Sequence, residues 1–133
     1  MEERESDCLQ EHTMQFLEMA FRSDRRKVIQ NPDGYGKNKG SCGDTIEIFL
    51  TVRGGRIESV YYETDGCLNT NACCNTLAEM SEGKSLEDAW EIYPDTLIEY
   101  LQTLPPENHH CAELALGAFY LALADYEKKI QDS

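Results

Sequence analysis

The chain has 133 residues, of which 25 are acidic and 12 are basic, so its formal charge is −13. This charge argues against nucleic acid as a partner, because phosphates would be repelled except at a dedicated basic patch. Apolar residues make up 41% of the chain, and no run reaches the roughly 18 residues that a membrane span needs. The composition predicts one soluble domain over residues 1–133, with residues 1–30 as an N-terminal helix and linker and residues 31–133 as the core.

The role of the six cysteines depends on whether the chain works in a reducing or an oxidising compartment. The first ten residues, MEERESDCLQ, are acidic, whereas a secretory signal begins with basic residues and continues with an apolar stretch. A cytoplasmic location is therefore expected. In a reducing cytosol, cysteines that lie far apart and form no CxxC motif are more typical of metal ligands, redox groups or core residues than of disulfides.

The first elements predicted along the chain are a helix and a β-hairpin. Apolar residues recur at helical spacing from Asp7, a suitable N-cap, as far as Phe21. Residues 31–40, NPDGYGKNKG, are rich in Gly and Asn and predict a loop. In residues 44–66, two runs of alternating apolar residues flank RGG at residues 53–55. This pattern predicts two antiparallel strands joined by a turn whose glycines adopt positive φ.

Helical patterns follow for the rest of the chain. The first covers residues 70–82 and is closed by Gly83, the next begins after Ser85, the third opens at Pro94, and the last covers about residues 108–129. Strands followed by helices, without β–α alternation, predict an α+β fold. We expect a small antiparallel sheet of two to three strands that is covered on one face by helices.

Three cysteines stand at places suited to metal binding. Cys42 and Asp44, in GSCGD, point to the same side if the segment is extended. Cys67 lies at a strand-to-helix junction and Cys111 in the first turn of a helix, where free N–H groups favour the thiolate. His110 adds a nitrogen ligand. Thiolates select zinc, Cu(I) or iron–sulfur clusters rather than Mg²⁺ or Ca²⁺, and ligand type alone leaves zinc and a cluster open.

Each of these interpretations has a simpler alternative. Cys73 and Cys74 fall inside a predicted helix and are expected to be buried core residues. Asp44 can instead be a hydrogen-bond acceptor that begins its turn. His110 and Cys111 resemble a thiol–imidazole pair, but neighbouring helical residues point about 100° apart. No nucleophile–base pair therefore predicts an enzyme.

Six segments occur in order along the chain: NPDGYG, SCGDTIEIFLTV, IESVYYETDGCLNTNACC, EGKSLEDAWEI, LPPENHHCAELA and ALADYEKK. Together they resemble the U-type iron–sulfur cluster assembly scaffold family, the type that includes IscU and the NifU N-terminal domain. The resemblance extends from Asn31 to Lys129. The joint occurrence of CGD, GC, GKS, LPP and HC is highly specific, although any one of them alone is weak.

The resemblance implies a scaffold rather than an enzyme. A cysteine desulfurase would deliver sulfur, iron would be added, and a transient [2Fe–2S] cluster would form before transfer to apo-proteins. The family pattern places the ligands of the cluster, or of zinc in the same site, on Cys42, Asp44, Cys67, His110 and Cys111. Three thiolates would hold iron, while the harder carboxylate or imidazole would make a weaker bond that can be exchanged.

The chain departs from the family pattern in three places, one of which is Cys73 and Cys74, at helix positions that family members usually fill with small or hydroxyl residues. The stretch before Cys42 is short, which favours a two-stranded sheet. LPP at residues 104–106 is followed by Glu107 and Asn108 rather than by a hydrophobic residue and Lys, so binding of an Hsp70-type chaperone is not expected. The other partners expected are a desulfurase and apo acceptor proteins, with a homodimer left open.

Two alternative functions remain at this stage. One is a zinc-binding sulfur acceptor that activates a cysteine desulfurase, although family members of that kind generally carry an insertion before the third cysteine that this chain lacks. The other is a structural or interaction protein that kept the fold and lost the function, which the altered LPPEN segment motivates.

Overall fold

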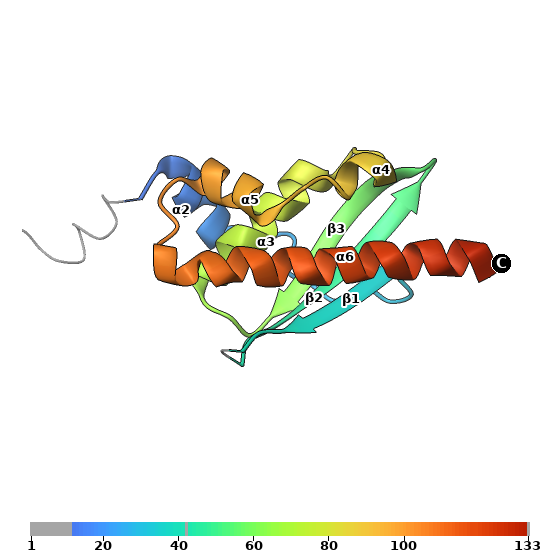
Figure 1. Cartoon of the computed structure of the whole chain (residues 1–133), viewed down its shortest axis with the longest axis horizontal. Helices are drawn as coiled ribbons and strands as arrows, with labels where there is room; N and C mark the ends of the chain where they lie inside the picture. Colours follow the sequence, from blue (N-terminus) through green and yellow to red (C-terminus); the bar gives the residue numbers. More distant parts are fainter. Residues whose placement is uncertain (1–11, 42, 133) are drawn as a thin grey trace, which may run out of the picture.

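The computed structural model describes residues 12–41 and 43–132 (Figure 1). Among these residues, no helix is both long and apolar enough to cross a membrane. The elements in chain order are α2 (Met14–Phe21), β1 (Gly34–Lys39), β2 (Thr45–Arg53), β3 (Arg56–Thr64), α3 (Leu68–Ser81), α4 (Leu86–Ala89), α5 (Pro94–Leu101), the 3₁₀ turn η1 (Pro106–Asn108) and α6 (His109–Asp132).

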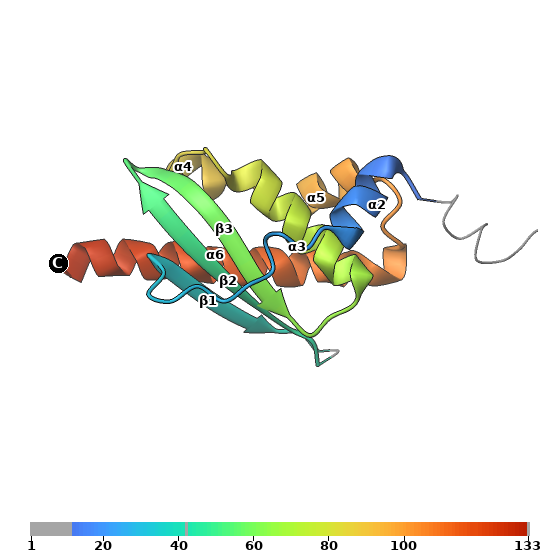
Figure 2. The same ribbon diagram turned by 180° about the vertical axis from the view of Figure 1, so that it is seen from behind.

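The sheet has three antiparallel strands in the order β1-β2-β3. The predicted β2–β3 hairpin is confirmed, with φ angles of 61° and 76° at Gly54 and Gly55 in its turn. Side chains that alternate along β2 are fully buried, among them Ile46, Ile48 and Leu50. Helices α3 and α6 cover one face of the sheet, as the front and rear views show (Figures 1 and 2). The predicted α+β architecture is thus confirmed.

Strand β1 corrects the prediction of a loop at residues 31–40 and of a two-stranded sheet. Gly34 and Gly36 pair with β2 and face α6. A Cβ on Gly34 would lie 2.5 Å from the carbonyl oxygen of Ala122, and one on Gly36 would lie 2.1 Å from that of Ala118. The glycines therefore allow a helix backbone to approach a strand closely and do not mark a loop.

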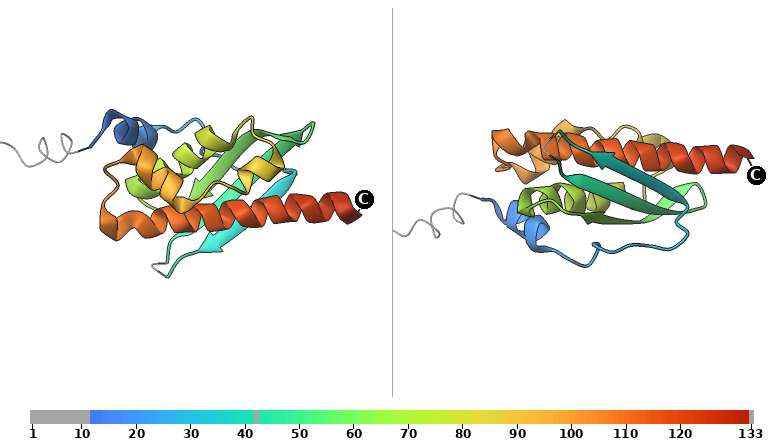
Figure 3. Two further views of the ribbon diagram at one scale, coloured as in Figure 1. Left: turned by 45° about the horizontal axis from the view of Figure 1, so that its top comes forward. Right: turned by 90° about the horizontal axis from the view of Figure 1, so that it is seen from below.

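The N-terminal helix is shorter than predicted. Helix α2 begins at Met14, where the Thr13 side chain accepts a hydrogen bond of 3.1 Å from the backbone N–H of Phe16. A threonine hydroxyl at the N-cap satisfies a free N–H group of the first turn. The predicted cap, Asp7, lies outside the described residues. After α2, residues 22–33 run past the sheet on the side away from α6 and lead into β1 (Figure 3).

The remaining helices follow their predicted signals. Ser85 caps α4 by accepting a hydrogen bond from the N–H of Asp88, and Pro94 is the first residue of α5. Gly83 has a φ of 90°, which suits the end of α3. Helix α3 begins two residues earlier than predicted, because Cys67 is its N-cap. The start of α6 comes directly after η1, so a 3₁₀ turn positions the helix end that carries Cys111.

Candidate metal centre

The first part of the candidate site is the turn that joins β1 to β2. The N–H of Gly40 donates to the carbonyl oxygen of Asp44 (2.9 Å), and the N–H of Gly43 donates to that of Gly40 (3.0 Å). Gly43 has a φ of 98°, a conformation that a side chain would disfavour. The main-chain carbonyl of Asp44, rather than its carboxylate, accepts the hydrogen bond that closes the turn. Cys42 belongs to this turn but lies outside the described residues.

The second part is the junction of β3 and α3, which carries Cys67. Cys67 is exposed, and its side chain makes no capping hydrogen bond although it occupies the N-cap. Two hydrogen bonds join this junction to the first turn. The N–H of Thr45 donates to Oδ1 of Asp65 (2.8 Å), and Oγ1 of Thr64 donates to the carbonyl oxygen of Thr45 (2.6 Å). The segments that carry Asp44 and Cys67 are therefore held side by side.

The third part is the start of α6. Cys111 is 1% exposed, and its Sγ receives hydrogen bonds from Oγ1 of Thr70 (3.5 Å) and Nδ2 of Asn108 (4.0 Å). Sequence reasoning missed both donors as parts of the site. Thr70 follows Cys67 by three residues, and Asn108 precedes Cys111 by three, which is the spacing of neighbours on one helical face. Polar residues at this spacing from a candidate ligand are a signal that could have found them.

His110 converges on Cys111. Its Nδ1 lies 3.0 Å from the carbonyl oxygen of Glu107, and its Nε2 lies 3.8 Å from Sγ of Cys111. Because a carbonyl only accepts, Nδ1 donates to it, which leaves Nε2 as the ring nitrogen nearest the sulfur. Ligands of one tetrahedral zinc ion would place such nitrogen and sulfur atoms about 3.6 Å apart. The expectation that the side chains of His110 and Cys111 diverge was wrong, because the imidazole of His110 is turned toward Sγ of Cys111.

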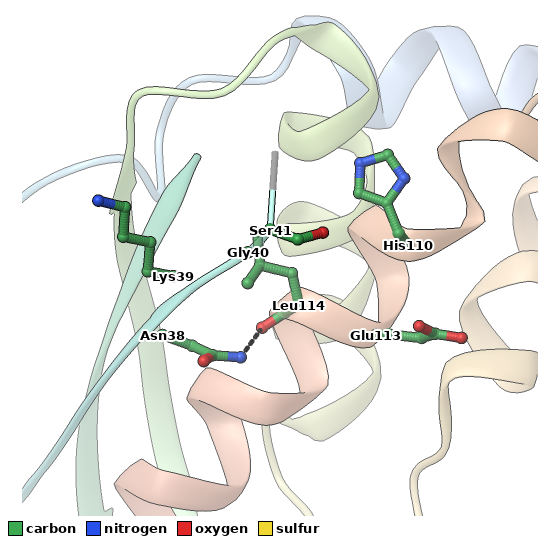
Figure 4. Close-up of a pocket in the computed structure, with 7 residues that line it drawn as sticks. All are labelled: Asn38, Lys39, Gly40, Ser41, His110, Glu113 and Leu114. Carbon is green, nitrogen blue, oxygen red and sulfur yellow. Dashed lines mark hydrogen bonds between the residues drawn. The ribbon is translucent and has the colours of Figure 1, made fainter. Parts of the chain in front are cut away.

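A pocket of about 220 Å³ lies between the first turn and α6 (Figure 4). Gly40 and Ser41 line it from the turn, and His110 lines it from the start of the helix. Asn38 and Leu114 also line the pocket, and Nδ2 of Asn38 donates to the carbonyl oxygen of Leu114 at 3.3 Å, which joins β1 to α6 there. Gly40 and Ser41 of the turn therefore face His110 across this pocket.

The described residues do not by themselves complete a metal site. Over residues 12–41 and 43–132, no group of three His, Cys, Asp or Glu side chains could hold one metal ion. Cys42 belongs to the one gap between these ranges. Cys73 and Cys74 are both 0% exposed, which confirms that they are buried. Burial raises the pKa of each thiol well above its usual value.

Comparison with known proteins places this arrangement in a family. The family model for the NifU-like N terminal domain matches residues 25–133. The chain belongs to this NifU-like family. The predicted family resemblance is therefore confirmed over a longer segment than the one from which it was recognised.

Two curated relatives are similar to this NifU-like chain in sequence, and one solved structure is similar to it in fold. It is 36% identical over 102 residues to the iron-sulfur cluster assembly scaffold protein IscU 1 of Archaeoglobus fulgidus, which aligns 76% of the chain and 67% of the relative. It is 37% identical over 90 residues to IscU of Escherichia coli, aligning 67% and 70%. The NifU-like N-terminal structure from Brucella abortus has a TM-score of 0.72 at 18% identity, covering 88% of this chain and 94% of that one.

Proposed function

We propose that this chain is a scaffold on which an iron–sulfur cluster is assembled and from which it is passed on. The observation that carries the proposal is the pairing of His110 Nε2 with Cys111 Sγ, 3.8 Å apart, beside the joined segments that carry Asp44 and Cys67. Membership of the NifU-like family and the names of the two curated relatives support the same function.

The proposed ligands are Cys42, Asp44, Cys67, His110 and Cys111. The thiolates would hold iron of a [2Fe–2S] cluster, which is the cargo, and the carboxylate or the imidazole would supply a harder bond that exchanges more readily. The exposed thiol of Cys67 gives a route for incoming groups. Sulfur would come from a cysteine desulfurase, and the cluster would leave for apo acceptor proteins.

Zinc is the second candidate, because the spacing of His110 Nε2 and Cys111 Sγ suits one tetrahedral ion. In that case the chain would be a sulfur acceptor that activates a cysteine desulfurase, and zinc would occupy the same ligands. The two functions predict different results when metal-free protein is offered iron with sulfide or zinc.

Anaerobic reconstitution tests the proposal. With iron and sulfide, the full chain should develop the visible spectrum of a [2Fe–2S] cluster, measured together with iron and sulfide content. Cys42→Ser, Cys67→Ser and Cys111→Ser should each reduce cluster retention at least about tenfold, because a hydroxyl cannot replace a thiolate for a soft metal.

Cys74→Ala serves as the matched control and should retain the cluster. Full retention by one of the three serine variants would remove that residue from the site. Tight zinc binding without any cluster formation would instead favour the sulfur acceptor.

We also propose that an Hsp70-type chaperone does not recognise this chain at LPPEN. Leu104 is 4% exposed, whereas Glu107 is exposed and acidic. The backbone of Glu107 is engaged by His110, and the side chain of Asn108 by Cys111. Calorimetry with a peptide spanning residues 101–110 should detect weak binding or none, and Asn108→Lys in that peptide should increase affinity if the missing charge is the cause. Tight binding of the unmodified peptide would contradict this proposal.

A further inference from the structure

The hydroxyl of Thr70 has its hydrogen-bond partner on another helix. A buried threonine or serine inside a helix commonly donates to the carbonyl four residues earlier. Ser81, in the same helix, does so, since its Oγ donates to the carbonyl oxygen of Leu77 at 2.7 Å. Thr70 is the third residue of α3, so the carbonyl four residues earlier precedes the helix, and its hydroxyl donates across to α6, to Sγ of Cys111 at 3.5 Å. The acceptor is a candidate ligand on another element.

The neighbourhood of Thr70 holds its side chain in place. Thr70 is 0% exposed and Cys111 is 1% exposed, so the hydrogen bond between them is shielded from water. A Cβ on Gly66 would lie 2.5 Å from Oγ1 of Thr70, 2.7 Å from its Cβ and 2.9 Å from its Cγ2. Glycine at residue 66 therefore leaves the space that the threonine side chain occupies. The DGC sequence thus accommodates Thr70 as well as presenting Cys67.

The sulfur of Cys111 receives a second, longer hydrogen bond from Nδ2 of Asn108 at 4.0 Å. The two donors come from different elements, α3 and η1, and approach the sulfur from separate parts of the chain. Cys67 differs, because it is exposed at the end of α3. The two described thiols of the site therefore have unequal surroundings.

We propose that Thr70 is a positioning residue that aims the sulfur of Cys111 and reduces the electron density that this sulfur gives to a bound metal. The inference rests on the proposed function, because it treats Cys111 as a ligand. Hydrogen bonds to ligand sulfurs stabilise negative charge on them and tune the metal site. Loss of the hydroxyl should leave Cys111 a stronger electron donor that is less well fixed in direction.

The hydrogen bond itself is tested without metal. In the metal-free full chain, nuclear magnetic resonance should show a Thr70 hydroxyl proton that exchanges slowly with water. Cys111→Ala removes the acceptor and should speed that exchange. Slow exchange that persists in Cys111→Ala, or fast exchange in the unmodified chain, would overturn the inference whatever the fate of the proposed function.

The effect on bound metal is tested with Co²⁺, whose sulfur-to-cobalt charge-transfer absorption reports ligand electron density. Thr70→Val keeps the side-chain shape but lacks the donor, so the absorption should shift to lower energy, whereas Thr70→Ser should restore the original position. Thr76→Val is the matched control. Thr76 is also buried in α3, but within the part of the chain that the structure describes its hydroxyl has no hydrogen-bond partner, and its replacement should leave the absorption unchanged.

Each outcome of the cobalt experiment supports or overturns the inference. An unshifted absorption in Thr70→Val would overturn it, as would an equal shift in Thr76→Val, which would indicate general repacking of α3. If Cys111→Ser gives the same absorption as the unmodified chain, Cys111 is not a ligand, and the proposed function loses that residue together with the inference.

Discussion

Cys67 and Cys74 belong to the same helix, α3, one as its N-cap and the other in its interior, and they differ in their exposure to solvent. Cys67 caps α3 and is exposed, whereas Cys74 lies two turns further on and is 0% exposed. Burial raises the pKa of the Cys74 thiol, so that it stays protonated at neutral pH. Only the thiolate binds metal or attacks an electrophile. Position along one helix therefore separates a thiol that reagents can reach from a buried one that stays protonated.

The largest expected difference between the two thiols is in their rates of alkylation. Native protein treated with iodoacetamide should be modified at Cys67, while Cys73 and Cys74 should react roughly a thousandfold more slowly, because their exposure requires unfolding. Mass spectrometry of peptides after timed quenching measures these rates. Equal rates at Cys67 and Cys74 would mean that α3 opens readily and that the comparison fails.

A second expected difference is in stability. Cys74→Ser buries a hydroxyl in an apolar site and should lower the free energy of unfolding by about 2 kcal/mol. Cys67→Ser places a serine at the exposed N-cap of α3 and should leave the free energy of unfolding unchanged or raise it by up to about 1 kcal/mol. Urea denaturation of the metal-free protein provides both values. A reversed order would show that Cys67 contributes to packing that its exposure does not reveal.

The smallest expected effect concerns Asp44, on the turn beside Cys67. Its carboxylate is a hard ligand next to soft ones, so Asp44→Ala should still assemble a cluster but should slow its transfer to an apo-ferredoxin severalfold. The measurement is transfer from protein loaded under anaerobic conditions. Equal transfer rates for the unmodified chain and Asp44→Ala would mean that Asp44 is only a turn residue. Failure of Asp44→Ala to assemble any cluster would mean that Asp44 is needed for iron entry.

The fold could be predicted from the sequence where local signals act alone. Ser85, Pro94 and the turn glycines at residues 54 and 55 have the predicted roles, because caps and positive φ angles depend on nearby atoms. Strand β1 could not be predicted, since Gly34 and Gly36 are required by the distant backbone of α6. Composition cannot distinguish a glycine in a loop from one beneath a helix.

The candidate site could be predicted only in part, for a similar reason. The sequence indicated Cys67 and Cys111, and the structure links their helices through Thr70. The contact between His110 and Cys111 depends on a side-chain rotation that helical spacing does not specify. The sulfur donors Thr70 and Asn108 likewise depend on how α3, η1 and α6 meet. Cys42 lies outside the described residues, so its part in the site stays a prediction.

Thr45 is hydrogen-bonded through both its N–H and its carbonyl oxygen to the segment that precedes Cys67. Separating the two segments would break both bonds, at a net cost of about 1 kcal/mol each. A state with the segments apart would then be populated at about 3% of molecules. Such an open state would be a minor one that still contributes to the average. The strength of the two hydrogen bonds of Thr45 would thus influence how long a bound metal or cluster stays in the site.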